Sequence, residues 1–118
     1  MENNTYSVNE KKGTITYCLT YNGDKFFGIA RCNSSDEFLI SKGIKIAKVR
    51  ANLQIRKQVI SEIQDYLENL QYSFEPSYYP PSIRKLKAKA IYDCNQALKL
   101  EREYKKRDEQ YLKELCLG

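Results

Sequence analysis

The placement of the prolines constrains the fold of this chain more than any other feature. All three lie within six positions, as Pro76, Pro80 and Pro81. Because a proline breaks the interior of a helix, the long stretches on either side are free to be helical. We therefore predict a first long helix over residues 41–72, entered near Ser41, a linker over residues 73–82, and a second long helix over residues 83–116, capped by Ser82.

Apolar residues recur at heptad spacing along both predicted helices. The first helix carries one series at Ile46, Leu53, Ile60 and Leu67, and a second at Val49, Ile63 and Leu70, interrupted by Arg56. The second helix carries Ile83, Ala90, Ala97, Tyr104 and Tyr111. Such seams are typical of helices that pack on other helices, so we predict an antiparallel helical hairpin.

The length of these helices favours an oligomer. A helix of about 30 residues is roughly 45 Å long, whereas a compact chain of this size is about 35 Å across. A hairpin that extends beyond its own core is best covered by a second copy. We therefore predict a homo-oligomer with a two-fold dimer as its smallest unit. The alternative is a bent hairpin that covers the sheet by itself.

The N-terminal third has the pattern of a β-hairpin. Residues 14–21 are rich in β-branched and aromatic side chains, and a similar run follows over residues 25–32. The step Asn22-Gly23 between them is a strong turn signal because both residues tolerate a positive φ. We predict a hairpin or small antiparallel sheet over residues 12–32, preceded by a frayed polar segment. The fold class is α+β, in one domain over residues 1–118.

Composition excludes several classes of function. The chain has no histidine, so a Ser-His-Asp triad, a Cys-His pair and a zinc site containing histidine are all excluded. We expect no enzymatic activity, no cofactor and no metal. The four cysteines form no C-x-x-C pair, and we expect buried free thiols. Neither a signal peptide nor a membrane span is expected, which indicates a cytoplasmic protein.

Several residues are candidates for binding an anion. The chain has 20 basic and 15 acidic residues, a net charge of +5, and the basic ones gather at the two helix entries. Arg31 ends the second predicted strand, close to the entry of the first helix, where an anion site is favoured. Arg56 within an apolar seam requires either a phosphate or a carboxylate, for which the chain offers Glu101, Glu103 and Asp108.

The linker and the second helix supply further candidates. Phe74, Tyr78 and Tyr79 stand beside Arg84, a combination that suits stacking on a base and pairing with a phosphate. They would equally pin a proline-rich turn onto the helix ends. Asn95 could read a base or ribose edge, or be an ordinary exposed polar residue. Arg107 completes the set of predicted ligand-binding residues.

One segment resembles a pattern found in small phage proteins. In that pattern a strand ends in a Lys/Arg-Cys pair, an Asp-x-Phe turn follows, and a helix containing glycine ends in Arg-Ala. The matching residues here are Arg31-Cys32, Asp36-Glu37-Phe38, Gly43 and Arg50-Ala51. With its long helices and its linker of aromatic residues and prolines, the chain resembles the first type of phage Thoeris anti-defence protein.

The resemblance implies a sponge that binds a cyclic ADP-ribose isomer in the cytoplasm of the infected cell and so blocks anti-phage defence, with cyclic oligonucleotides as further candidate ligands. It implies a ligand bound between subunits, with Arg31 as a phosphate ligand. The rival interpretation is a small basic protein that binds nucleic acid or inhibits a host protein directly. A charge of +5 would support only weak, salt-sensitive binding to nucleic acid, so a small ligand is favoured.

Overall fold

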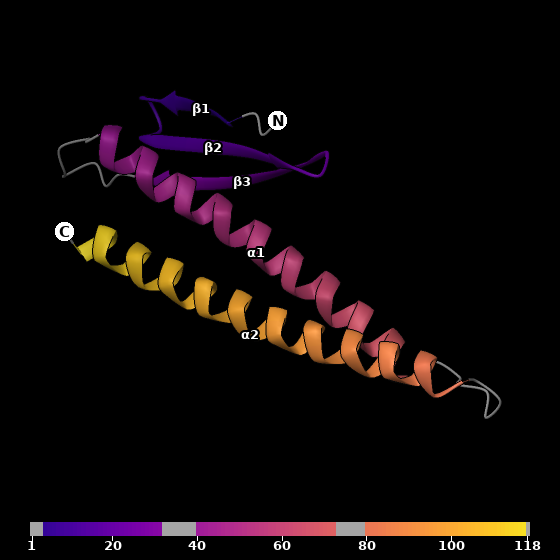
Figure 1. The fold of residues 1–118 in the computed structure, drawn as a ribbon. Helices are drawn as coiled ribbons and strands as arrows, with labels where there is room; N and C mark the ends of the chain where they lie inside the picture. Colours follow the sequence, from indigo (N-terminus) through magenta and orange to yellow (C-terminus); the bar gives the residue numbers. More distant parts are fainter. Residues whose placement is uncertain (1–3, 32–39, 73–79, 118) are drawn as a thin grey trace. The chain divides into compact units, whose positions relative to one another are not determined.

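The computed structural model describes residues 4–31, 40–72 and 80–117 (Figure 1). Three strands, β1 (Asn4–Asn9), β2 (Thr14–Tyr21) and β3 (Asp24–Arg31), precede two helices, α1 (Ile40–Tyr72) and α2 (Pro81–Leu117). The α+β class is confirmed, and the helix boundaries lie within two residues of those predicted.

The strands form one antiparallel sheet in the order β1-β2-β3. The turn between β2 and β3 is the predicted one, because Asn22 and Gly23 have φ values of 50° and 82°. The expectation of a frayed N-terminus is wrong for residues 4–9, which pair with β2 from Asn4↔Leu19 to Asn9↔Thr14. The ring of Tyr6 stacks on Tyr17, with centroids 6.2 Å apart. This contact offsets the polar composition of β1.

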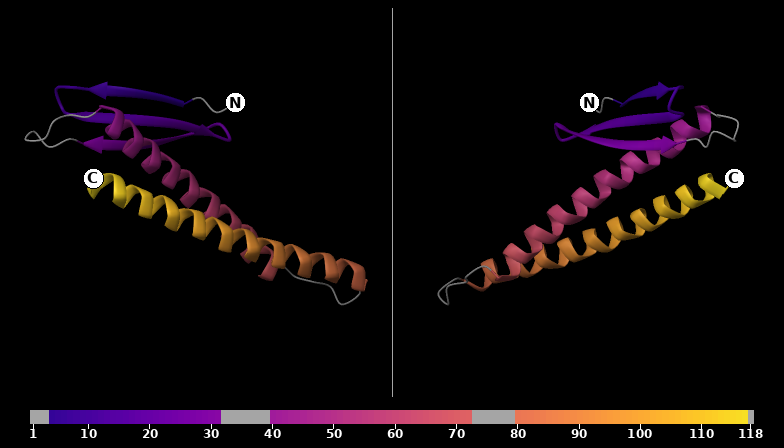
Figure 2. Two further views of the ribbon diagram at one scale, coloured as in Figure 1. Left: turned by 60° about the vertical axis from the view of Figure 1, so that its left-hand side comes forward. Right: turned by 180° about the vertical axis from the view of Figure 1, so that it is seen from behind.

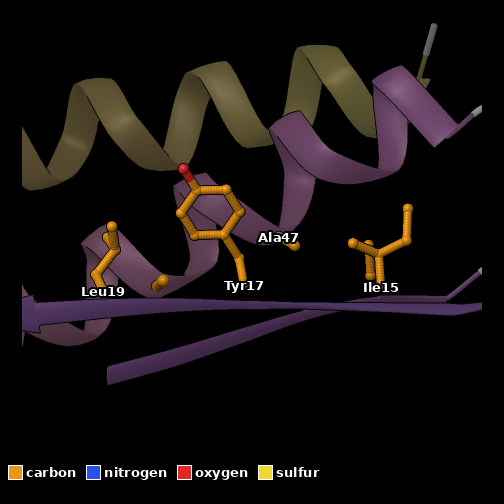
Figure 3. Packing of buried hydrophobic residues seen from close by; sticks show 6 residues of the cluster. Ile15, Tyr17, Leu19 and Ala47 are labelled. Carbon is orange, nitrogen blue, oxygen red and sulfur yellow. The ribbon is translucent and has the colours of Figure 1, made fainter. Parts of the chain in front are cut away.

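The chain divides into two compact units. The sheet unit comprises residues 1–57 and 105–118, and the hairpin unit comprises residues 58–104. In the sheet unit, Ile15, Tyr17 and Leu19 point from one face of β2 towards α1, where Ala47 lies (Figure 3). Ala30 and Ala51 complete this buried cluster. The first part of α1 therefore covers this face of the sheet.

Glycine allows this helix to approach the sheet closely. A Cβ at Gly28 of β3 would collide with the backbone of Ala47 and Ala51, so α1 and β3 are in direct backbone contact there. A Cβ at Gly43 of α1 would lie 2.5 Å from Cδ1 of Ile15. The side chain of Arg50 donates a hydrogen bond to the carbonyl of Ile29 on β3. Together these contacts fix the first turns of α1 on the sheet.

In the hairpin unit, residues 58–72 of α1 run antiparallel to residues 81–104 of α2 (Figure 2). Most residues of the predicted seams are buried or half-buried here, Leu67 most fully, but Ile83 is 42% exposed, so the seam of α2 does not include its first turn. Leu98, the other buried side chain among those described in this unit, lies outside the predicted seam. Ser82 does not cap α2 as predicted. The helix begins at Pro81, and the carbonyl of Pro80 accepts hydrogen bonds from the amides of Ile83 and Arg84. A proline suits the first helical position because its missing N–H has no partner there.

Two expectations from composition are met in part. Within the described ranges, no helix has the length and apolar character required to cross a bilayer. Cys18, Cys94 and Cys116 are free thiols. Cys18 and Cys94 are half-buried and Cys116 is exposed, so the prediction of buried cysteines is wrong for Cys116. Its place near the end of α2 leaves it outside the seam. Cys32 lies outside the described residues.

Candidate functional site

The face of the sheet opposite α1 presents an aromatic ring between two cations. Side chains alternate along a strand, so Gly28 and Ala30 of β3 turn towards α1. The intervening residues Lys25, Phe27, Ile29 and Arg31 turn the other way and are exposed. Phe27 is 54% exposed and Ile29 43%, which is unusual for large apolar side chains in the middle of a strand. We call this surface the open sheet face.

The neighbouring strands add hydroxyl groups to this face. The register places Thr14 opposite Arg31, Thr16 opposite Ile29, Cys18 opposite Phe27 and Thr20 opposite Lys25. On β1, Thr5 and Ser7 are opposite Cys18 and Thr16 and lie on the same face. The open sheet face therefore combines an aromatic ring, two cations and a row of hydroxyl groups.

The excess positive charge of the chain belongs to the same unit. By sequence, the sheet unit contains 14 Lys and Arg residues against 8 Asp and Glu, whereas the hairpin unit contains 6 against 7. The basic entry of α2 is offset by acidic residues of α1 such as Glu62, Asp65 and Glu68, as the antiparallel arrangement predicts. An anionic ligand is therefore attracted to the sheet unit.

This combination of groups suits binding. An exposed ring can stack on a base, a cation can pair with a phosphate, and hydroxyl groups can donate to or accept from a ribose. Along the strand, the Cα atom of Phe27 is about 7 Å from that of Lys25 and about 13 Å from that of Arg31. The long side chains of the two cations can therefore extend towards a ligand that stacks on the ring of Phe27. Among the residues that the structure describes, no three Cys, Asp or Glu side chains gather as metal ligands.

Arg31 is the predicted site residue that lies on this face, at the end of β3. Arg56 lies in the sheet unit but in the helix seam. Its Nε donates to Oδ2 of Asp108 over 2.9 Å, with both side chains about one third exposed. Of the two partners considered for Arg56, the structure therefore provides the carboxylate.

The other predicted residues are not gathered at one point. Arg107 is exposed on the part of α2 in the sheet unit, and Arg84 and Asn95 are exposed on the part in the hairpin unit. Arg84 and Asn95 are separated along α2 by about 16 Å. The exposure of Asn95 agrees with its interpretation as an ordinary polar residue. Phe74, Tyr78 and Tyr79 lie outside the described residues.

Sequence reasoning missed Phe27 and its polar neighbours. Their signal is the alternation of small and large residues in β3, where Gly28 and Ala30 mark the face that a helix approaches closely. Phe27 and Ile29 then necessarily lie on the other face. Hydrophobicity alone assigns Phe27 to the core, which is why it was not a candidate.

The hairpin unit has a hollow whose chemistry differs from that of the open sheet face. In the hairpin unit, an open depression of about 340 Å³ is lined by Glu62, Ile63, Tyr66, Asp93, Cys94 and Ala97. Its floor is apolar, and its two charged residues are both acidic. An anionic ligand is therefore not favoured there.

Comparison with known proteins returns no relative. No protein-family model matches the chain, and no curated protein or solved structure matches it either.

Proposed function

We propose that this protein binds a small anionic nucleotide on its open sheet face and withholds it from other proteins. The observation that carries the proposal is the exposed ring of Phe27, flanked on one strand by Lys25 and Arg31. A base stacks on the ring, while Arg31 and Lys25 pair with phosphate groups. The hydroxyl groups of Thr14, Thr16 and Ser7 form hydrogen bonds with the ribose.

The resemblance to the first type of Thoeris anti-defence protein suggests the identity of the ligand. It is a cyclic ADP-ribose isomer, which carries two phosphates, two ribose rings and an adenine. Arg31 is both the residue that the resemblance indicates and a member of the open sheet face. Sequestration requires no general base, and the absence of histidine is compatible with capture without conversion. In this proposal the protein is a homo-oligomer in the cytoplasm of an infected cell.

Calorimetric titration of the full chain with cyclic ADP-ribose isomers tests the proposal. We expect micromolar or tighter binding by the natural chain. Phe27→Ala and Arg31→Ala should each weaken it by about tenfold or more, because a stacked base or a phosphate pair contributes about 1–3 kcal/mol. Tyr92→Ala and Arg102→Ala are matched controls, since both residues are exposed but belong to the hairpin unit. Equal affinity in all five proteins would refute the open sheet face as the site.

The rival function is binding of nucleic acid through the same ring and cations. The two are separated by titration with a single-stranded oligonucleotide at 50 and 200 mM salt. Contacts to six or more phosphates of a single strand would lower the affinity by about 300-fold or more across this range, whereas two phosphates would lower it by less than about tenfold. Tight binding of the oligonucleotide, with no binding of a cyclic nucleotide, would favour the rival.

A further inference from the structure

The side chain of Arg50 extends from α1 to the backbone of β3. Its Cβ lies next to Gly28, because a Cβ added to that glycine would be only 2.9 Å away from it. Its guanidinium donates a hydrogen bond to the carbonyl oxygen of Ile29, and this bond is exposed to solvent. The residue as a whole is half-buried. Arg50 is therefore held at both ends of its side chain, while its charged end stays accessible.

The hydrogen-bond pattern of the sheet places this carbonyl at the free edge of β3. The pair that closes a two-residue hairpin exchanges both of its backbone hydrogen bonds, and bonded and non-bonded pairs then alternate along the strands. The closing pair here is Tyr21↔Asp24, so Ile29 and Arg31 both belong to non-bonded pairs. Their backbone N–H and C=O groups point away from β2. No described strand pairs with this edge, since the order is β1-β2-β3.

The free edge of β3 therefore gathers hydrogen-bond donors and positive charge. The backbone N–H groups of Ile29 and Arg31 are about 7 Å apart along the strand, and the guanidinium of Arg50 lies beside them. A guanidinium has five N–H donors, so one bond to a carbonyl leaves others for an anion. Among the residues that the structure describes, no carboxylate forms an ion pair with Arg31 or Arg50.

We propose that the free edge of β3 is a phosphate-binding subsite of the open sheet face. Arg50 and the backbone N–H of Ile29 bind one phosphate group, and the side chain of Arg31 pairs with the same group. We call these three groups the edge subsite. Because the carbonyl of Ile29 already holds the guanidinium of Arg50, little side-chain freedom is lost when the phosphate binds.

The edge subsite extends the proposed nucleotide site, and the inference rests on that proposed function. Phe27 precedes Ile29 by two residues, about 7 Å along β3. A base stacked on the ring of Phe27 and a phosphate at the edge subsite are therefore close enough to belong to one small nucleotide. Arg50 is then a binding residue supplied by α1, in addition to those supplied by the sheet.

Calorimetric titration with cyclic ADP-ribose isomers tests the role of Arg50. Arg50→Gln keeps an N–H donor but removes the charge, and it should weaken binding by about tenfold or more, because hydrogen bonds between charged groups are the strong ones. Arg50→Lys restores the charge and should bind more tightly than Arg50→Gln. Lys48→Gln is the matched control, since it removes one positive charge at an exposed position about 160° around α1. It should leave the affinity unchanged.

Urea denaturation of the same variants separates binding from stability. If Arg50 only held α1 against β3, the affinity of Arg50→Gln and Arg50→Lys would fall in proportion to their loss of stability. The edge subsite instead predicts different affinities in two variants of similar stability.

Inorganic pyrophosphate tests the edge subsite without a nucleotide. In NMR spectra of the isotope-labelled full chain, pyrophosphate should shift the amide signals of Ile29 and Arg31 and the Nε–H signal of Arg50. The amide shifts should be smaller in Arg50→Gln. The Nε–H signal of Arg102, an exposed residue of the hairpin unit, is the internal control and should not move.

The two titrations distinguish this inference from the proposed function. Shifts at the edge subsite in pyrophosphate, without binding of any cyclic ADP-ribose isomer, would support the subsite and refute the proposed ligand. Nucleotide binding that Phe27→Ala weakens and Arg50→Gln does not would overturn the edge subsite and leave the proposed function standing. Amide signals of Ile29 and Arg31 that pyrophosphate does not move would overturn the subsite as well.

Discussion

Gly28 fixes the distance between α1 and the sheet. A methyl group at this position would overlap backbone atoms of Ala47 and Ala51, which cannot move aside as the end of a flexible side chain can. We expect Gly28→Ala to lower the free energy of unfolding by about 3 kcal/mol or more, at the upper end of what overpacking costs. Urea denaturation measures the change. Ile29→Ala is the control, because Ile29 is the exposed neighbour of Gly28 and its substitution should lower the free energy of unfolding by less than about 1 kcal/mol. Equal losses of stability in the two variants would contradict the close approach of α1 and β3.

Gly43 differs from Gly28 because the atoms close to it belong to a side chain, that of Ile15, and not to the backbone. Alanine there would improve helix propensity by about 1 kcal/mol, but its Cβ would lie 2.5 Å from Cδ1 of the fully buried Ile15. We expect Gly43→Ala to destabilise the natural chain. In an Ile15→Val background, which lacks Cδ1, the same change should be neutral or stabilising.

A double-mutant cycle by urea denaturation separates these effects. Ile15→Val alone should cost about 1 kcal/mol. Additive free energies for the two substitutions would show that Gly43 and Ile15 do not constrain one another.

At the scale of elements, the hairpin turn and the two helices were predictable from local signals. Asn22-Gly23 predicts a tight turn because both residues tolerate a positive φ. The cluster of prolines separates the two helices regardless of what packs on them. β1 was not predictable in this way, because its residues are polar and its stability depends on pairing with β2 and on the contact between Tyr6 and Tyr17. The first residue of α2 was ambiguous in the sequence, because Pro81 and Ser82 are both residue types that favour the start of a helix.

The ion pair of Arg56 and Asp108 joins α1 to α2 within the sheet unit. Both side chains are about one third exposed, so solvent screens the pair and its contribution is modest. We expect Asp108→Ala to cost about 1 kcal/mol. Replacing both residues by leucine should leave stability equal or higher, because apolar residues suit a seam.

The same double variant tests the role of Arg56 in ligand binding. If Arg56 only stabilises the contact between α1 and α2, the double variant should bind cyclic ADP-ribose isomers with the affinity of the natural chain, as measured by calorimetry. A loss of binding in a folded double variant would instead assign Arg56 to the ligand.

For the whole molecule, the class of fold followed from the sequence, but of the candidate site only Arg31 did. Patterns of hydrophobicity identify helices and strands, yet they do not state which face of a three-stranded sheet a helix will cover. That choice depends on Gly28, Ala30 and Ala47, whose small size matters only once α1 is in contact with β3. Phe27 and Arg31 are left on the other face as a consequence. The excess positive charge, once it is divided between the two units, belongs to the sheet unit that carries this face.

Capture without conversion is the central claim, and one measurement addresses it directly. A cyclic ADP-ribose isomer is incubated with the full chain, the free fraction is removed by filtration, and the retained protein is denatured by heat. Mass spectrometry then measures the ligand that is released. The account predicts recovery of the intact cyclic compound from the natural chain. Little or none should be recovered from the double variant that combines Phe27→Ala and Arg31→Ala. Recovery of a linear or hydrolysed product, or no retention by the natural chain, would contradict it.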